Sequence, residues 1–320
     1  ASSPRMNVAD LRTKGWEASV TWGDSFTLAS KPFNYRIMAG IGDNTSKVTK
    51  YDNPNRTLTD PYEGQQLGEI WGYVVDGYFK TDEEARNYKV DQSFVNQMIN
   101  ASALDNGLHA GDLKFVDLDG NNKIEQTTSA NDRKDMKVIG NSLPRYNYNF
   151  GISADWYGID FSVLFQGIGK QNWYPGAETS MFWGPYSRPY ASFIPSDFMS
   201  QVWSEENTNA YFPRPRGYVA LGSNRELAVV NTKYLQNLAY CRLKNLSIGY
   251  TLPDKWLSKI GFEKIRVYFS GENLLTFTKL HSDYIDPEQA SASNSWKTSK
   301  SDANIYPWAK TYSFGVDITF

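Results

Sequence analysis

The last ten residues alternate strictly between two kinds of side chain. In 311–320 every even-numbered residue is apolar or aromatic, and every odd-numbered residue is small or polar. Because successive side chains of a β-strand point to opposite faces, this period of two predicts a strand with one apolar and one polar face. The sequence stops inside this run, on Phe320, which is typical of bacterial outer-membrane barrels.

The same alternation recurs in six further segments. In the clearest of them, Tyr146, Phe150 and Trp156 share one parity while Asn147 and Asn149 share the other. Most segments have about the ten residues that a tilted transmembrane strand needs. The predicted strands lie near 15–23, 34–50, 145–157, 159–170, 238–252, 264–277 and 310–320.

The connections between these segments fall into two classes. Short links are expected at 22–34, 156–160 and 253–264, whereas long irregular stretches cover 51–143, 170–235 and 278–308. A soluble β-sandwich also alternates, but compact soluble domains rarely contain structureless loops beyond about 15 residues. If successive strands alternate in direction, all the long stretches lie on one side. We therefore predict an all-β fold, a transmembrane antiparallel β-barrel with long extracellular loops.

Composition argues against several classes of protein. The mean hydropathy is -0.55, and no apolar run approaches the 18 residues of a membrane-spanning helix. A net charge of -2 provides no basic surface for nucleic acid. His109 and His281 are too few and too isolated for a histidine metal centre or a Ser-His-Asp triad, and Cys241 has no internal disulfide partner. No nucleophile–base pair is recognisable, so we do not expect an enzyme.

Several longer segments carry a family resemblance through their order and spacing. The chain resembles the C-terminal part of SusC/RagA-type TonB-dependent outer-membrane transporters over essentially its whole length. The segments are NVADLRTKGWEASV at 7–20, GEIWGYVVDGYF at 68–79, GDLKFVDLDGNNKI at 111–124, VIGNSLPRYNYNFG at 138–151, WSEENTNAYFPR at 203–214, RLKNLSIGYTLP at 242–253, VYFSGENLLTF at 267–277, and Asp286-Pro287-Glu288.

The resemblance implies a barrel of about 22 strands, plugged by an N-terminal domain and capped by a SusD-like surface lipoprotein. Such proteins import oligosaccharides or peptides across the outer membrane, with energy delivered through TonB. About seven strands are too few to close a pore-sized barrel. Residues 1–320 are therefore expected to be the C-terminal segment of the larger barrel, without the plug domain and the TonB-contacting part.

An acidic loop is the sharpest chemical motif. Asp117, Asp119 and Asn121 provide oxygen ligands at positions 1, 3 and 5 of an EF-hand-like calcium loop, with the Lys123 carbonyl at position 7. The motif departs from the pattern at position 4, which is glycine, and at position 12, which is threonine; Asp132 is the expected substitute for the latter. Calcium is thus a possible ligand, and no other cofactor is expected. The alternative is a turn braced by its own Asp and Asn side chains.

Ligand-binding residues are expected in the aromatic part of the second long stretch. Aromatic faces stack on sugar rings or peptide side chains, and polar groups fix orientation. The alternative is a loop that packs on itself or on the SusD-like lipoprotein. The candidates are Trp173, Tyr174, Trp183, Tyr186 and Arg188.

Two functions from different classes remain open. The first is import of oligomeric nutrients, glycans or oligopeptides, with outer-membrane lipid and a SusD-like lipoprotein as partners. The second is a secreted carbohydrate-binding β-sandwich without transport activity. A sandwich buries its apolar strand faces against a second sheet, whereas a barrel exposes them to lipid. In the barrel, Arg266 and Glu272 face the lumen, where they are expected to pair with each other or to brace the plug.

Overall fold

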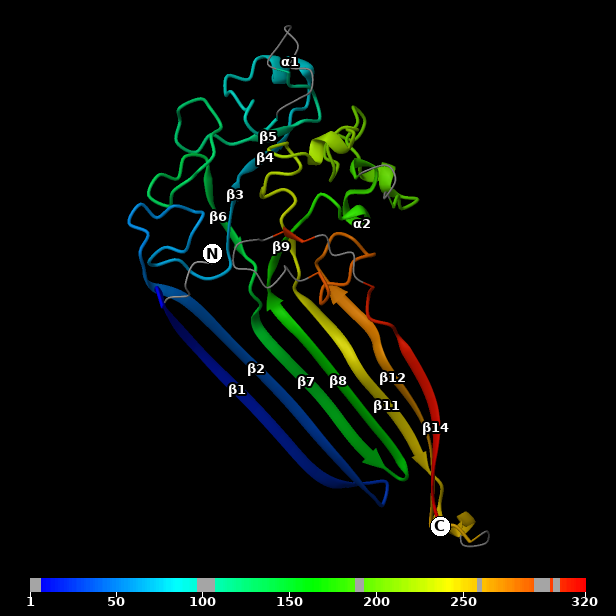
Figure 1. Ribbon diagram of the computed structural model, residues 1–320. Coiled ribbons are helices and arrows are strands. Elements are labelled where there is room, and N and C mark those ends of the chain that lie inside the picture. Colours follow the sequence, from blue (N-terminus) through cyan, green and yellow to red (C-terminus); the bar gives the residue numbers. More distant parts are fainter. Residues whose placement is uncertain (1–6, 97–106, 188–192, 258–260, 291–299, 302–305) are drawn as a thin grey trace, which may run out of the picture.

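One antiparallel sheet of seven long strands dominates the molecule (Figure 1). The computed structural model describes residues 7–96, 107–187, 193–257, 261–290, 300–301 and 306–320. The strands follow one another in space in chain order, each hydrogen-bonded to the next. They are β1 (Ala9–Leu28), β2 (Lys31–Tyr51), β7 (Arg145–Trp156), β8 (Ile159–Lys170), β11 (Tyr240–Thr251), β12 (Lys264–Thr278) and β14 (Thr311–Thr319). Each of the seven predicted segments overlaps one of these strands, although β1 is about twice as long as predicted.

Tight connections join the strands at one end of the sheet. The β1–β2 turn consists of Ala29 and Ser30, and the β7–β8 turn of Tyr157 and Gly158, all with positive φ. Two central residues with positive φ define the turn whose twist matches paired strands. The predicted link at 22–34 was wrong, because β1 and β2 remain paired almost to this turn. The third connection, 252–263, contains α3 (Asp254–Leu257).

The strand register sorts apolar and polar side chains onto opposite faces. One row across the sheet pairs Phe314, Phe269, Ile248, Phe161, Ala154 and Tyr35. The adjacent row, on the other face, pairs Ser313, Ser270, Ser247, Ser162, Ser153 and Arg36. The period-two pattern of each strand is therefore aligned between strands, as one continuous apolar face and one continuous polar face require.

No second sheet covers the apolar face in the described part of the chain. Phe314 is 84% exposed, Val20 62% and Ile248 45%. Water-soluble proteins rarely leave an apolar surface of this extent uncovered. The sandwich alternative therefore does not describe this fold, whereas an outward-facing apolar band is what a transmembrane barrel presents to lipid. None of the helices among the described residues is long and apolar enough to cross a membrane.

The polar face carries ion pairs that link different strands. Arg266 lies between Asp160, with a shortest N–O distance of 2.6 Å, and Asp317, at 3.2 Å. Asn34 donates to Asp155 at 2.8 Å along the same wall. The expected Arg266–Glu272 pair does not form, because the two residues lie six positions apart in one strand. Arg266 instead contacts Asp317 in the adjacent strand β14 and, across Gly249 of β11, Asp160 in β8.

The three long connections lie together at the other end of the sheet (Figure 1). The first contains β3 (Glu69–Tyr73), β4 (Val75–Tyr78), α1 (Asp82–Arg86), β5 (Leu113–Phe115) and β6 (Met136–Asn141). The second contains β9 (Asn172–Pro175), α2 (Ser180–Trp183), the 3-10 helices η1 (Gly184–Tyr186), η3 (Phe198–Gln201) and η4 (Tyr218–Leu221), and β10 (Gln236–Asn237). The third contains β13 (Lys300–Ser301), which pairs with β9.

These connections form a folded unit with its own hydrophobic core, which we call the loop body (residues 52–144, 171–239 and 279–310, where described). Phe115 from the first connection, Trp183 from the second and Ile285 from the third belong to one buried cluster. The prediction of irregular, structureless loops was therefore wrong. Their apolar residues show no periodicity because they come from short turns and bridges, not from long helices or strands.

Candidate functional site

The aromatic candidates for ligand binding lie inside the loop body. Trp173, Tyr174 and Trp183 have no exposed surface, and Tyr186 is 1% exposed. The Tyr186 hydroxyl donates to the Pro213 carbonyl at 2.7 Å. Side chains without accessible faces cannot stack on a ligand, so in this conformation the four form a core. They therefore fit the alternative interpretation, a loop that packs on itself. The fifth candidate, Arg188, lies outside the described residues.

The acidic motif folds into a compact turn. Asp117 accepts the backbone N–H groups of Gly120 and Asn122, each at 2.7 Å. Asp119 accepts from the Asn121 backbone at 3.1 Å, and the Asn121 side chain accepts from the Lys123 backbone at 2.8 Å. The turn therefore has the self-braced form of the alternative interpretation. Carboxylates that accept backbone amides in this way are also compatible with an EF-hand-like loop.

A different aspartate completes the acidic cluster. Carboxylate oxygens of Asp117, Asp119 and Asp135 lie within 4.8 Å of one another. Asp132, the predicted ligand, is not in this group; its backbone N–H donates to Ser129 in a neighbouring turn. Burial raises the pKa of the Asp135 carboxyl, and the charges of Asp119 and Asp117 add to the shift. Clustered oxygens of this kind suit a hard cation such as calcium, so calcium binding stays a prediction, with Asp135 in place of Asp132.

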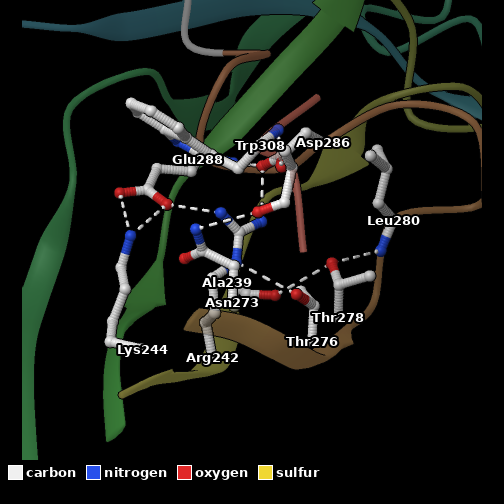
Figure 2. Close-up of polar contacts among 11 residues, drawn as sticks. Ala239, Arg242, Lys244, Asn273, Thr276, Thr278, Leu280, Asp286, Glu288 and Trp308 are labelled. Carbon is white, nitrogen blue, oxygen red and sulfur yellow. Dashed lines mark hydrogen bonds and ion pairs between the residues drawn. The ribbon is translucent and has the colours of Figure 1, made fainter. Parts of the chain in front are cut away.

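A charged cluster joins the third connection to the polar face of the sheet (Figure 2). Arg242 of β11 is 2% exposed, and its guanidinium contacts Asp286 and Glu288, each at 2.6 Å. Lys244 reaches the same Glu288 carboxylate at 2.8 Å. Asp286 also accepts the backbone N–H of Trp308 at 3.2 Å, which fixes the chain just before β14. Both cations and both anions are thus paired, as buried charges require.

A cavity of about 640 Å³ lies beside this cluster. Its lining includes Arg242 and Thr276 from the strand ends, and Tyr284, Asp286 and Trp308 from the third connection. Arg242 and Thr276 pair across the two strands on the polar face, so the cavity lies on the lumenal side of the sheet, beneath the loop body. Its volume is within the range of ligand sites, about 300–1,000 Å³. The period-two pattern does not predict this site, although the run Asp286-Pro287-Glu288 and the cation Arg242 within a strand are visible signals of it.

The fold is that of a segment of a transmembrane antiparallel barrel, with a folded loop body over one end. No family model matches the sequence. The chain is 27% identical over 338 residues to "TonB-dependent receptor P3" and 24% identical over 347 residues to "TonB-dependent receptor P39", both from Formosa agariphila. All of this chain is covered, but only 30% and 31% of those proteins. The chain thus spans about a third of the length of these relatives.

Solved structures agree in fold. A structure described as the RagAB peptide transporter superposes with a TM-score of 0.64 at 18% identity, covering 98% of this chain and 29% of that one. A RagAB peptide importer in the "closed-closed" state gives 0.60 at 20% identity, covering 98% and 30%. The sequence is thus similar to TonB-dependent receptors and the fold to the RagAB structures, as expected for a segment of a SusC/RagA-type transporter.

Proposed function

We propose that this chain forms part of the barrel of an outer-membrane importer for oligomeric nutrients. The observation that carries the proposal is the separation of faces, with a continuous apolar band outside, a polar wall inside and a folded loop body over one end of the wall. An outward apolar band suits lipid, and a polar wall suits a hydrated path. The names of the relatives, all TonB-dependent receptors, support active transport over a passive pore.

The partners and the cargo also belong to the proposal. Energy is delivered through TonB by parts of the transporter outside this chain, and a SusD-like lipoprotein docks on the loop body. The cargo is an oligopeptide or a glycan, held between the two proteins before uptake. Structural neighbours are described as peptide importers, which supports the peptide alternative for this chain. The chain contributes binding and passage, and catalysis is not part of the proposal.

Uptake by intact cells tests this function. A strain without the full transporter gene is compared with the same strain complemented by the intact gene, using fluorescent oligopeptides and neutral oligosaccharides of matched length. The deletion should abolish uptake of one of the two classes, and complementation should restore it. The protein should fractionate with the outer membrane and require detergent for extraction. Recovery from the soluble fraction, or unchanged uptake of both classes, contradicts the proposal.

A further inference from the structure

The outer end of β12 is paired on one side only. β11 accompanies β12 as far as Thr278, whereas β14 pairs with it only from Lys264 to Glu272. Among the described residues, no strand pairs with the free edge of the segment 273–278. Leu275 through Thr278 are exposed, so the described residues leave this part of the segment open. Backbone groups along such an edge are a template for another extended chain.

The cavity of about 640 Å³ opens beside this segment. Asn273, Thr276 and Thr278 line it, opposite the stretch that leads into β14. Asn273 donates to the Ala309 carbonyl at 3.3 Å, so the cavity follows the strand from the point where β14 leaves it. An extended chain on the free edge would therefore have its alternate side chains directed into the cavity.

Exposed aromatic rings form much of the cavity wall. Trp308 is 51% exposed, Tyr284 47% and Phe193 39%, and the last two rings pack edge to face at 4.8 Å. These rings contrast with the buried aromatics of the loop-body core. Rings held open to solvent around a cavity are suited to apolar and aromatic side chains.

The described residues of the cavity wall carry no net charge. Two cations, Arg242 and Lys310, and two anions, Asp283 and Asp286, line the cavity. Arg242 and Asp286 neutralise each other at 2.6 Å, and the remaining two are of opposite sign. Electrostatic complementarity therefore disfavours a polyanionic or polycationic ligand and suits one whose charges balance.

From this geometry we infer that the cavity and the free edge of 273–278 form a subsite for a net-neutral oligopeptide, which adds to β12 as an extra strand. The inference rests on the proposed import function and assigns its cargo class. A peptide pairs its backbone with the edge while alternate side chains enter the aromatic cavity. A glycan has rings for the aromatic wall but no repeating amide to pair with the strand, so it would leave the edge groups unused.

N-methylation of the peptide backbone separates the hydrogen bonds made to the strand edge from the side-chain contacts made in the cavity. The probe is a non-repeating, net-neutral octapeptide with aliphatic and aromatic residues, bound to the full transporter in detergent. Successive N–H groups of a strand point to opposite edges. A version N-methylated at one set of alternate residues should therefore bind at least about tenfold more weakly, through the loss of two or three hydrogen bonds. The version methylated at the other set should bind within about twofold of the parent. Equal affinity of all three versions overturns the inference.

Removal of the Trp308 ring tests whether the aromatic wall of the cavity contributes to peptide binding. Trp308→Ala keeps the backbone N–H that bonds Asp286, and should weaken binding of the octapeptide about tenfold. The matched control is Tyr218→Ala, which removes an aromatic of similar exposure, 53%, from η4, away from this cavity. Control binding should be unchanged, and loss of affinity in both variants or in neither overturns the assignment.

Binding and uptake of the two probes distinguish a failure of the peptide subsite from a failure of the import function. If a neutral oligosaccharide of matched length is imported and the octapeptide is neither bound nor imported, the peptide subsite is wrong while the import function stands. If cells lacking the transporter take up both probes as well as complemented cells do, the import function itself fails and this subsite fails with it.

Discussion

Phe314 and Ser313 are neighbours in β14 that point to opposite faces of the sheet. Phe314 pairs with Phe269 in the apolar band, and Ser313 with Ser270 on the polar wall. Phe314→Arg should destabilise the assembled barrel by about 2–4 kcal/mol, because its charge faces the hydrocarbon near mid-membrane. Ser313→Arg is the matched control and should cost less, because its charge faces the lumen. Denaturant titration of the full transporter in lipid measures both. An equal cost would contradict the assignment of faces.

We expect Glu226 to make the stability of the loop body depend on pH. Its carboxylate is 2% exposed and faces Arg216, at 2.9 Å, and Asp112 and Arg214 of the same cluster. Burial raises its pKa to about 7, while Arg216 opposes the shift. A folded-state pKa above the ordinary value of 4.5 means that the folded loop body binds the proton more tightly than the unfolded one. Its contribution to stability is therefore largest at low pH and is lost as the pH rises from 4.5 through about 7.

Glu226→Gln should remove this dependence. Hydrogen exchange of the Leu227 amide, corrected for intrinsic rates, should show greater protection at pH 5.5 than at 7.5 in the parent. The variant should show equal protection at the two values. Stronger protection of the parent at the higher pH would contradict the direction of the pKa shift.

At the scale of elements, the strands were predictable and the loop body was not. Period two is visible along ten residues of one strand such as β14, and the register then follows because each strand has a single apolar face. The core of the loop body joins Phe115, Trp183 and Ile285 from three irregular segments, and no local pattern signals contacts over such separations. The same limit explains why Asp132 was predicted in the acidic cluster: position counting along the motif cannot show that the chain folds back to bring Asp135 there.

Substitution of Trp183 tests whether the loop body folds as a unit separate from the sheet. It has no exposed surface, and its indole N–H donates to the Gly176 carbonyl at 2.9 Å. Trp183→Ala should destabilise the loop body by about 3–5 kcal/mol through the cavity left behind. Proteolysis within 171–239 should accelerate while the barrel stays assembled and resistant. Simultaneous cleavage of the membrane strands would mean that the two parts unfold together.

The acidic turn is the element at which we expect calcium to bind. If Asp117, Asp119, Asn121 and Asp135 bind the ion, six or seven oxygens should surround it at about 2.3–2.6 Å. Added calcium should then slow hydrogen exchange of the turn in the parent protein, because a ligand that binds only the folded state stabilises it. Asp119→Ala should abolish the effect, and Asp132→Ala should preserve it because Asp132 lies outside the cluster. Loss of the effect in Asp132→Ala would restore that residue as a ligand.

At the scale of the whole molecule, the sheet has two open edges. β1 and β14 are the outermost strands, and among the described residues no strand pairs with their outer sides. Hydrocarbon does not tolerate rows of unpaired backbone groups, and seven strands do not close a barrel of pore size. Residues 1–320 expressed alone should therefore fail to insert stably into the outer membrane. Within the full transporter, the outer edges of β1 and β14 should pair with further strands. Cysteine pairs placed along either edge and its neighbour should cross-link in the full protein. Stable, protease-resistant insertion of residues 1–320 alone would show that the sheet satisfies its edges by itself, and the larger-barrel interpretation would fail.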